Sequence, residues 1–253
     1  MQNTTSLDRF RSLLVIAATI GTIAVNYLAS AGYLSGVTPA EVSDQYQTGV
    51  TPANYAFTVW NLIYLGLIGF SILQALPRHV ERFSSLRSPY IASCAVNCIW
   101  IYFWQSGQIA ICFALIVLLA VILTFIVARI EDTGSVIGSI VTRGTFGLYL
   151  GWVISAAIIN FAAMLAYLNV GLGAAADIVG ALLLIAAAGF GIAARVALTS
   201  YVAPLAVAWA LTAVAVKQSG KTLIVSAAAI GVVACLIAAF SFVLSLKDSN
   251  EQR

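Results

Sequence analysis

Aromatic rings and carboxamides are the chemically distinctive side chains within the apolar stretches of this sequence. Three sets recur at helical spacing, so that each set shares one face of a helix: Phe57, Trp60 and Tyr64; Asn97, Trp100 and Trp104; and Trp152, Ala156 and Asn160. Aromatic walls supply contact area and amides fix orientation, which suits a flat, largely apolar ligand with a few polar atoms. The alternative is that these side chains only pack helices, with Trp104 in an interfacial belt. The carboxamides within the apolar stretches would then bridge helices; they are those of Asn26, Asn61, Asn97 and Asn160.

Acid–base, nucleophilic and metal chemistry are not indicated inside these stretches. The 12 basic residues, the 9 acidic residues and the single histidine, His79, all fall outside them and are expected to lie in loops. Because ionisable groups inside a bilayer mark ion and proton pathways, this pattern argues against a proton-coupled pump or a transporter of charged substrates. His79 is predicted to be solvated, and Cys94, Cys98, Cys112 and Cys235 are predicted to be small buried hydrophobes. The sequence therefore predicts no enzyme, no metal site and no cofactor.

The composition defines the class of protein. Of 253 residues, 62% are hydrophobic and 8% are charged, whereas a soluble domain has about 25% charged residues. A soluble fold of this length could not bury so much apolar surface. The composition excludes a soluble enzyme, a disordered chain and a nucleic-acid binder, and it predicts a multi-spanning membrane protein.

Eight charge-free stretches approach the length of about 20 residues that a spanning helix needs. They are Leu13–Ala31, Tyr55–Leu76, Tyr90–Trp104, Ile109–Ala128, Phe146–Leu168, Ile178–Ala194, Tyr201–Val216 and Leu223–Leu246. The third and seventh are short and are expected to borrow a turn from their polar flanks. No stretch alternates apolar and polar residues as a barrel strand would. The predicted fold class is an all-α polytopic transmembrane helix bundle of about eight spans.

The positions of lysine and arginine orient the predicted bundle. With the N-terminus inside, the cytoplasmic side collects Arg9, Arg11, Arg78, Arg82, Arg87, Arg129, Arg143, Arg195, Lys247 and Arg253, and the outer side keeps Lys217 and Lys221. Both termini are therefore predicted to face the cytoplasm from the inner membrane, and the Gly32–Asn54 loop is predicted to cover the outer mouth. A signal peptide ending near Ala31 is the alternative for the N-terminus. The length of the apolar run disfavours that alternative.

Three segments resemble motifs of one known family, the TspO/MBR family of tryptophan-rich sensory proteins and translocator proteins. Pro52–Tyr64 resembles its P-x4-F-x2-W-x3-Y signature, Asn97–Phe103 its N-x2-W-x2-F element, and Tyr149–Asn160 its Y-x2-W-x3-A-x3-N element. The three occur in the family's order on the second, third and fifth predicted spans. Leu148 and Ser155 depart from the family pattern, which has a proline and a bulky aromatic residue at these places.

The resemblance implies a binding protein. Family members bind porphyrins and related hydrophobic ligands inside a five-helix bundle capped by the loop between the first two helices. Residues 1–168 are then expected to form that unit, and residues 169–253 to add three helices and a short cytoplasmic tail, as in longer bacterial members. Carried over by position, the ligand-binding residues are Phe57, Trp60, Tyr64, Asn97, Trp100, Trp152, Ala156 and Asn160.

The implied role is that of a sensor or regulator, and two alternatives remain open. One is a transporter of a neutral lipophilic compound, and the other is a membrane enzyme acting on a bound tetrapyrrole. Gly147 and Gly151 have the G-x3-G spacing of a close helix contact. The alanine-rich sixth span is expected to dock the added helices or to mediate a homodimer. The expected partners are thus a porphyrin-like molecule, the lipid bilayer and a second copy of the chain, with no nucleic acid.

Overall fold

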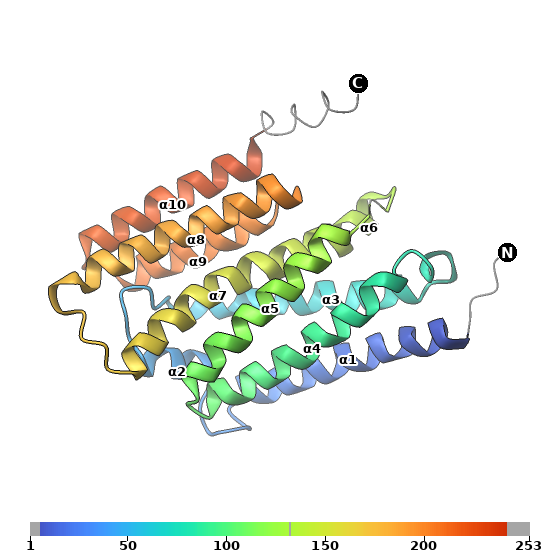
Figure 1. The fold of residues 1–253 in the computed structure, drawn as a ribbon, viewed down its shortest axis with the longest axis horizontal. Helices are drawn as coiled ribbons and strands as arrows, with labels where there is room; N and C mark the ends of the chain where they lie inside the picture. The colour runs from blue at the N-terminus through green and yellow to red at the C-terminus, as the bar shows by residue number, and fades with distance from the viewer. Residues whose placement is uncertain (1–5, 132, 242–253) are drawn as a thin grey trace. The chain divides into compact units, whose positions relative to one another are not determined.

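The computed structural model describes residues 6–131 and 133–241, and this part of the chain is all-α. The α-helices are α1 (Ser6–Ser30), α2 (Pro39–Gln45), α3 (Val59–Ala75), α4 (Ser84–Gln105), α5 (Ile109–Arg129), α6 (Val136–Ser139), α7 (Thr145–Tyr167), α8 (Ala176–Leu198), α9 (Ala203–Lys217) and α10 (Thr222–Phe240). Short 3-10 turns span Asn54–Thr58, Pro77–His79 and Gly173–Ala175, and a π-helical turn spans Ile140–Gly144. Figure 1 traces these helices in chain order.

Six helical segments of the described chain are long and apolar enough to cross a membrane. They are Leu7–Ser30, Asn54–Ala75, Ile109–Arg129, Val136–Tyr167, Gly173–Leu198 and Thr222–Phe240, with a shorter apolar helix at Ala203–Lys217. The predicted all-α polytopic bundle is thereby confirmed, and the span number of eight stays a prediction. The two further spans would be α4 and α9, which contain the two stretches that the sequence marks as short. α4 carries polar residues along its length, and α9 has 15 residues.

The chain forms two compact units. The first unit comprises Met1–Tyr46 and Phe57–Phe146, and the second comprises Gln47–Ala56 and Gly147–Arg253. α7 begins at the end of the first unit and continues in the second. This division follows contacts within the chain, whereas the expected boundary at residue 168 concerns the family unit and stays a prediction.

In the first unit, α1 packs against α3 and α4, and α4 lies beside α5 (Figure 1). Four buried rings form an aromatic core, in which Phe70 contacts Phe83, Tyr90 and Phe146 with ring centroids 4.9–5.7 Å apart. The Thr19 hydroxyl of α1 lies 2.5 Å from both Ser71 Oγ and Tyr90 Oη. Helices α1, α3 and α4 are therefore joined by shared hydroxyl hydrogen bonds as well as by ring packing.

Charged residues also lie inside helices, which corrects the prediction that all of them are loop residues. Arg87, in the first turn of α4, has 0% exposure, and Arg195, in the last turn of α8, has 2%. His79 is likewise buried, with its ring 5.8 Å from that of Phe83, and is not solvated. A charge therefore interrupts an apolar run in sequence without ending the helix, and at Arg87 partners distant in sequence satisfy it.

The loop that follows α1 carries a short helix, α2, which is fastened to the end of α4. Trp104 is buried and donates from its indole Nε1 to the Pro39 carbonyl at 3.0 Å, so it does not lie in an interfacial belt. Gln105 Nε2 donates to the Ala29 and Val37 carbonyls at 2.8 and 2.6 Å. These bonds hold the expected lid loop against α4 within the first unit.

A capping box begins α2, and its stability depends on pH. Thr38 Oγ1 accepts from the Glu41 backbone N–H, while Glu41 Oε2 accepts from the Thr38 backbone N–H at 2.6 Å. The hydrogen bonds from the Thr38 backbone and then from its side chain hold the pKa of Glu41 below its usual value of 4.5. A lowered carboxyl pKa adds stability above that usual value, and this stability is lost as the pH falls through the folded pKa.

Thr38→Ala is expected to speed amide hydrogen exchange in α2 at neutral pH, because it removes the side-chain half of the capping box. In the wild type, protection of α2 relative to intrinsic exchange rates should fall as the pH drops below 4.5. Hydrogen exchange followed by mass spectrometry measures both effects. Ser35→Ala, in the same loop, is the control and should leave α2 unchanged. Equal protection in Thr38→Ala and the wild type would mean that the box does not hold α2.

In the second unit, α8, α9 and α10 lie side by side (Figure 1). Small residues of α8, the sixth predicted span, form much of its buried face, which confirms that this span packs against the helices that follow. The segment Gln47–Ala56 packs on α9: the Ala53 backbone N–H donates to the Ala213 carbonyl, and Trp209 Nε1 donates to the Ala56 carbonyl, both at 3.0 Å. Gln218 Nε2 donates to the Thr48 and Thr51 carbonyls at 3.0 and 3.2 Å.

The predicted close contact at Gly147 and Gly151 is confirmed. A Cβ on Gly147 would lie 2.6 Å from Ser200 Oγ, and one on Gly151 would overlap the Ala203 carbonyl oxygen and lie 2.8 Å from Ala206 Cβ. Glycine lets the backbones of α7 and α9 approach at these positions because it has no Cβ.

Candidate functional site

The aromatic set on the second predicted span begins in a 3-10 turn and continues on α3. Phe57 lies in the turn and is half-buried. The rings of Trp60 and Tyr64, one helical turn apart, are stacked with centroids 5.5 Å apart and planes at 16°. Both are half-buried. Trp60 and Tyr64 thus form a continuous aromatic surface on one face of α3, with Phe57 in the turn that precedes it.

The set on α4 combines rings with one buried carboxamide. Trp100 and Trp104 are stacked with centroids 5.8 Å apart and planes at 21°. Asn97 lies one turn before Trp100 and has 0% exposure. Its Oδ1 accepts from Asn26 Nδ2 at 2.7 Å, and Asn26 Nδ2 also donates to the Thr22 carbonyl at 2.9 Å. Asn26 therefore bridges α1 to α4, as one interpretation of the sequence predicts.

One polar atom of Asn97 has no partner within the described residues. Its Nδ2 is buried and donates to no acceptor there. A buried amide N–H without an acceptor costs free energy, so native proteins usually pair it. Because Asn26 fixes the Oδ1 of the same carboxamide, the orientation of the Nδ2 donor is also fixed.

The third set lies on α7 in the second unit. Trp152, Ala156 and Asn160 are all buried. Asn160 Nδ2 donates to the Ala156 carbonyl at 2.8 Å, one turn earlier on the same face. Of the eight predicted ligand-binding residues, five belong to the first unit and three to the second. Within the units, the structure brings together Trp60 with Tyr64, and Ala156 with Asn160.

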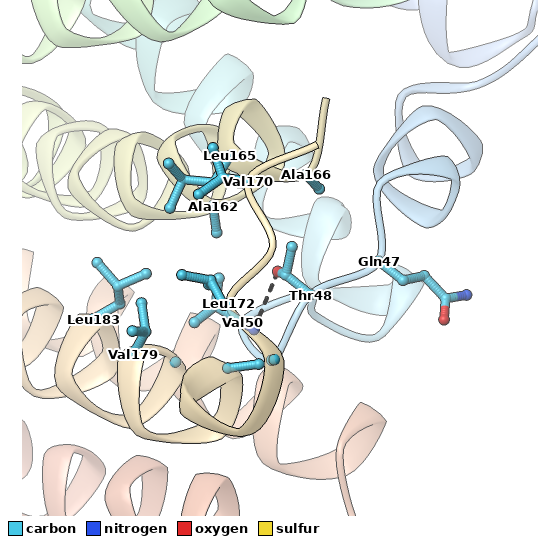
Figure 2. Close-up of a pocket in the computed structure, with 14 residues that line it drawn as sticks. Gln47, Thr48, Val50, Ala162, Leu165, Ala166, Val170, Leu172, Val179 and Leu183 are labelled. Atoms are coloured by element: carbon cyan, nitrogen blue, oxygen red, sulfur yellow. Dashed lines mark hydrogen bonds between the residues drawn. The ribbon is translucent and has the colours of Figure 1, made fainter. Parts of the chain in front are cut away.

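A cavity of about 210 Å³ lies in the second unit, and none of the eight predicted residues lines it. The C-terminal end of α7, the start of α8 and the segment 47–50 enclose it, with side chains such as Leu165, Val179 and Leu183 pointing into it (Figure 2). The Val50 backbone N–H donates to Thr48 Oγ1 at its edge. Ligand pockets usually measure about 300–1,000 Å³, so this cavity is too small for a tetrapyrrole. Sequence patterns do not reveal it because its lining is mostly aliphatic.

Comparison with known families shows the family to which this chain is related. A family model described as TSPO-like protein matches residues 12–242. This chain belongs to the TSPO-like protein family. The predicted resemblance is confirmed, and the match extends over both compact units. No curated protein and no solved structure was found to match the chain.

This TSPO-like protein is a multi-pass membrane protein, and the family is generally non-enzymatic. No group of three or more metal-ligating side chains occurs among the residues that the structure describes. The four cysteines are free thiols, and three of them are buried, while Cys98 is half-buried. What the three sets can do chemically is stack on an apolar ligand and donate a hydrogen bond to it.

Sequence patterns locate the rings and amides but do not show which amides have a donor left for a ligand. Nothing in the spacing distinguishes Asn97, whose donor is unpaired, from Asn160, whose donor is bonded to its own helix. Asn26 is the one residue that could have distinguished Asn97 from Asn160. It lies in the first predicted span at a depth similar to that of Asn97 in its own span. Its bond to Asn97 is a contact across 71 residues of sequence.

Proposed function

We propose that this TSPO-like protein binds a flat, hydrophobic molecule of the tetrapyrrole class and acts as a sensor or regulator. The observation that carries the proposal is the completely buried Asn97 carboxamide, whose Nδ2 has no acceptor among the described residues. A ligand carbonyl, carboxylate or ring nitrogen beside α4 would supply that acceptor. A tetrapyrrole offers all three kinds of atom next to a flat apolar surface.

The rings near Asn97 support the same class of ligand. Trp100 follows Asn97 by one helical turn, and α3 of the same unit carries the stacked Trp60–Tyr64 pair. Aromatic faces bind flat π-systems by offset stacking, with a gain of about 0.5–1.5 kcal/mol per pair beyond area burial. No ionisable group belongs to these sets apart from the Tyr64 phenol, so a ligand would be held by stacking and hydrogen bonding rather than by charge.

Asn97→Ala is expected to raise the Kd for protoporphyrin about tenfold, because it removes one hydrogen bond worth about 1–1.5 kcal/mol. Titration of the purified protein in detergent, followed by the shift of the porphyrin absorption band, measures this change. Asn61→Ala is the matched control, since Asn61 is an exposed carboxamide on α3. The same titration with Trp152→Phe and Asn160→Ala tests the α7 set separately. Absence of any band shift in the wild type, or equal binding by Asn97→Ala, would contradict the proposal.

A flux assay separates the sensor from the transporter. In proteoliposomes, tight binding without saturable uptake is expected for a sensor, whereas saturable uptake would favour transport of a neutral lipophilic compound. Lys221, which the transport alternative places at the outer mouth, forms an ion pair with Asp177 at 3.1 Å. Its charge is therefore already partnered within the second unit.

A further inference from the structure

Arg195 is a buried cation, and two of its donor nitrogens lack acceptors among the described residues. It has 2% exposure in the last turn of α8, and neither its Nε nor its Nη2 donates to any described residue. Its guanidinium carbon lies 3.7 Å from the centre of the Tyr201 ring, so the ring covers one face of the group. Stacking on a ring attracts the cation but leaves its in-plane N–H donors unpaired.

Arg87 shows how a buried arginine is ordinarily satisfied in this protein. Its Nε donates to Gln74 Oε1 at 3.0 Å, its Nη2 to the Val80 carbonyl at 2.6 Å, and its Nη1 to Asp8 Oδ1 at 3.4 Å. The Nε and Nη2 of Arg195 have no such acceptors in the described chain. A buried charge without partners is expensive, so an acceptor from outside the described chain is expected.

The second unit offers no carboxylate for Arg195 among its described residues. Asp177 is the one acidic residue there, and it is bonded to Lys221. Asp177 also lies in the first turn of α8, roughly 27 Å from Arg195 at 1.5 Å per residue. The counter-charge must therefore come from another source.

The two unpaired nitrogens identify the geometry of the missing partner. Nε and Nη2 lie on the same edge of the guanidinium, and their N–H bonds point in parallel. That edge binds two oxygens of one phosphate or carboxylate in a bidentate arrangement, which is among the strongest hydrogen-bonding patterns in proteins. The ligand chemistry is thus an oxyanion with two neighbouring oxygens.

The turn that follows α8 adds further donors. Ser200, with 5% exposure, has a buried Oγ without a described partner. α9, a helix of 15 residues, begins at Ala203 with no side-chain cap. Pro204 has no N–H and the Ala206 N–H donates to the Val202 carbonyl at 3.1 Å, so among residues 203–206 the backbone N–H groups without an intrahelical acceptor are those of Ala203 and Leu205. Ser200 Oγ and the Ala203 nitrogen both border Gly147, at 2.6 and 3.6 Å from the position of a Cβ on that residue. A helix N-terminus with free N–H groups favours anions, phosphate above all.

We propose that Arg195, together with Ser200 and the N-terminus of α9, binds a phosphate group. Arg195 lies one turn from the end of an apolar helix of 23 residues, and the ends of spanning helices lie at the depth of lipid headgroups. The phosphate of a phospholipid would reach the site with its chains along the apolar surface of α8. A free phosphate ion would present the same oxygens. The site is independent of the proposed tetrapyrrole site, which involves other residues.

The test uses the delipidated full-length protein in an uncharged detergent. Its thermal unfolding midpoint is measured during titration with phosphatidylglycerol, with diacylglycerol of the same chains, and with inorganic phosphate. Phosphatidylglycerol is expected to raise the midpoint, and diacylglycerol is not. If inorganic phosphate raises the midpoint as much as phosphatidylglycerol does, the ligand is a soluble anion. If phosphatidylglycerol raises the midpoint and inorganic phosphate does not, the ligand is the lipid. Equal effects of diacylglycerol and phosphatidylglycerol would overturn the proposal.

Arg195→Gln is expected to weaken the apparent affinity for the phosphate-bearing ligand at least about tenfold, and Arg195→Lys severalfold, since lysine keeps the charge but loses the two-pronged edge. Arg129→Gln is the matched control, because Arg129 also ends a helix and stacks on a ring, that of Phe125 at 3.9 Å, but is exposed. If Arg195→Gln does not fold, Arg195→Lys carries the comparison. An unchanged response in either Arg195 variant would overturn the proposal.

A carboxylate of the chain itself is the competing source of the anion. Asp248 and Glu251 lie outside the described residues. If neutralising both lowers the midpoint as much as Arg195→Gln does, and the wild type does not respond to phosphate in either form, the partner is that tail and the proposal fails. If the doubly neutralised variant keeps the wild-type response to phosphatidylglycerol or phosphate, the proposal stands.

Discussion

Arg87→Met is expected to lower the free energy of unfolding by about 3–5 kcal/mol, the usual loss when one partner of a buried charge network is removed. The methionine would leave Gln74 Oε1 and the Gln74 and Val80 carbonyls without their donor, and Asp8 without its cation. These groups come from α1, the end of α3 and the loop before α4. Chemical unfolding in a mild detergent, followed by circular dichroism, measures the change.

The expected loss of stability in Arg87→Met comes mainly from the Gln74 and Val80 oxygens that Arg87 hydrogen-bonds. The ion pair with Asp8 contributes less. Arg87 Nη1 lies 3.4 Å from Asp8 Oδ1, and the Asp8 side chain keeps 26% exposure, so the ion pair is partly screened. Asp8→Asn is therefore expected to cost about 1 kcal/mol or less. Arg87→Lys should be intermediate, because one ammonium cannot match the planar set of donors.

Arg82→Gln provides the control for Arg87→Met. Arg82 lies five residues earlier, is exposed, and donates one hydrogen bond to the Thr133 carbonyl at 3.3 Å. Its replacement is expected to change the free energy of unfolding by less than about 0.5 kcal/mol. If Arg87→Met and Arg82→Gln have equal effects, the buried network does not stabilise the first unit.

Gly151→Ala is expected to lower the free energy of unfolding by about 2 kcal/mol. The new methyl group would overlap the Ala203 carbonyl oxygen and lie 2.9 Å from the Ala203 carbonyl carbon. Because these are backbone atoms, α9 must shift as a whole. Overpacking of this kind costs about 3 kcal/mol, while alanine gains about 1 kcal/mol of helix propensity over glycine. The same unfolding assay measures the net loss.

Gly189→Ala is the matched control, with an effect of opposite sign. Gly189 also lies inside a helix of the second unit, but nothing lies within 4 Å of the position of its Cβ. The substitution should therefore stabilise the protein by about 0.5–1 kcal/mol through helix propensity. If both substitutions stabilise the protein, α7 and α9 do not pack through Gly151.

Local patterns predicted much of the fold correctly. The charge-free stretch Ile109–Ala128 became α5, Ile109–Arg129, because an unbroken apolar run of that length has no other stable arrangement in a bilayer. The i, i+4 spacing of Trp60 and Tyr64 correctly places both rings on one face of α3. The G-x3-G pattern correctly predicts a close contact of α7, but its partner, α9, is not evident in the sequence.

Hydropathy alone does not predict the short helix α2 or the burial of Trp104. The helix α2 lies in a segment expected to be a loop, although Thr38 and Glu41 have the spacing of a capping box and Pro39 favours a first helical position. The place of Trp104 near a helix end favours an interfacial belt. Its bond to the Pro39 carbonyl depends on the path of a loop 65 residues away in sequence.

The sequence by itself determined the class of protein, the approximate positions of the helices and the faces that carry rings and amides. These properties follow from the transfer free energy of each residue and from helical periodicity, which act over one or two turns. Only the tertiary structure decided which polar groups are satisfied. Arg87 meets acceptors 7, 13 and 79 residues away, whereas two donors of Arg195 and one of Asn97 meet none in the described chain. Whether a buried polar group has a partner depends on how distant segments pack together, and the spacing of residues in the sequence does not predict that packing.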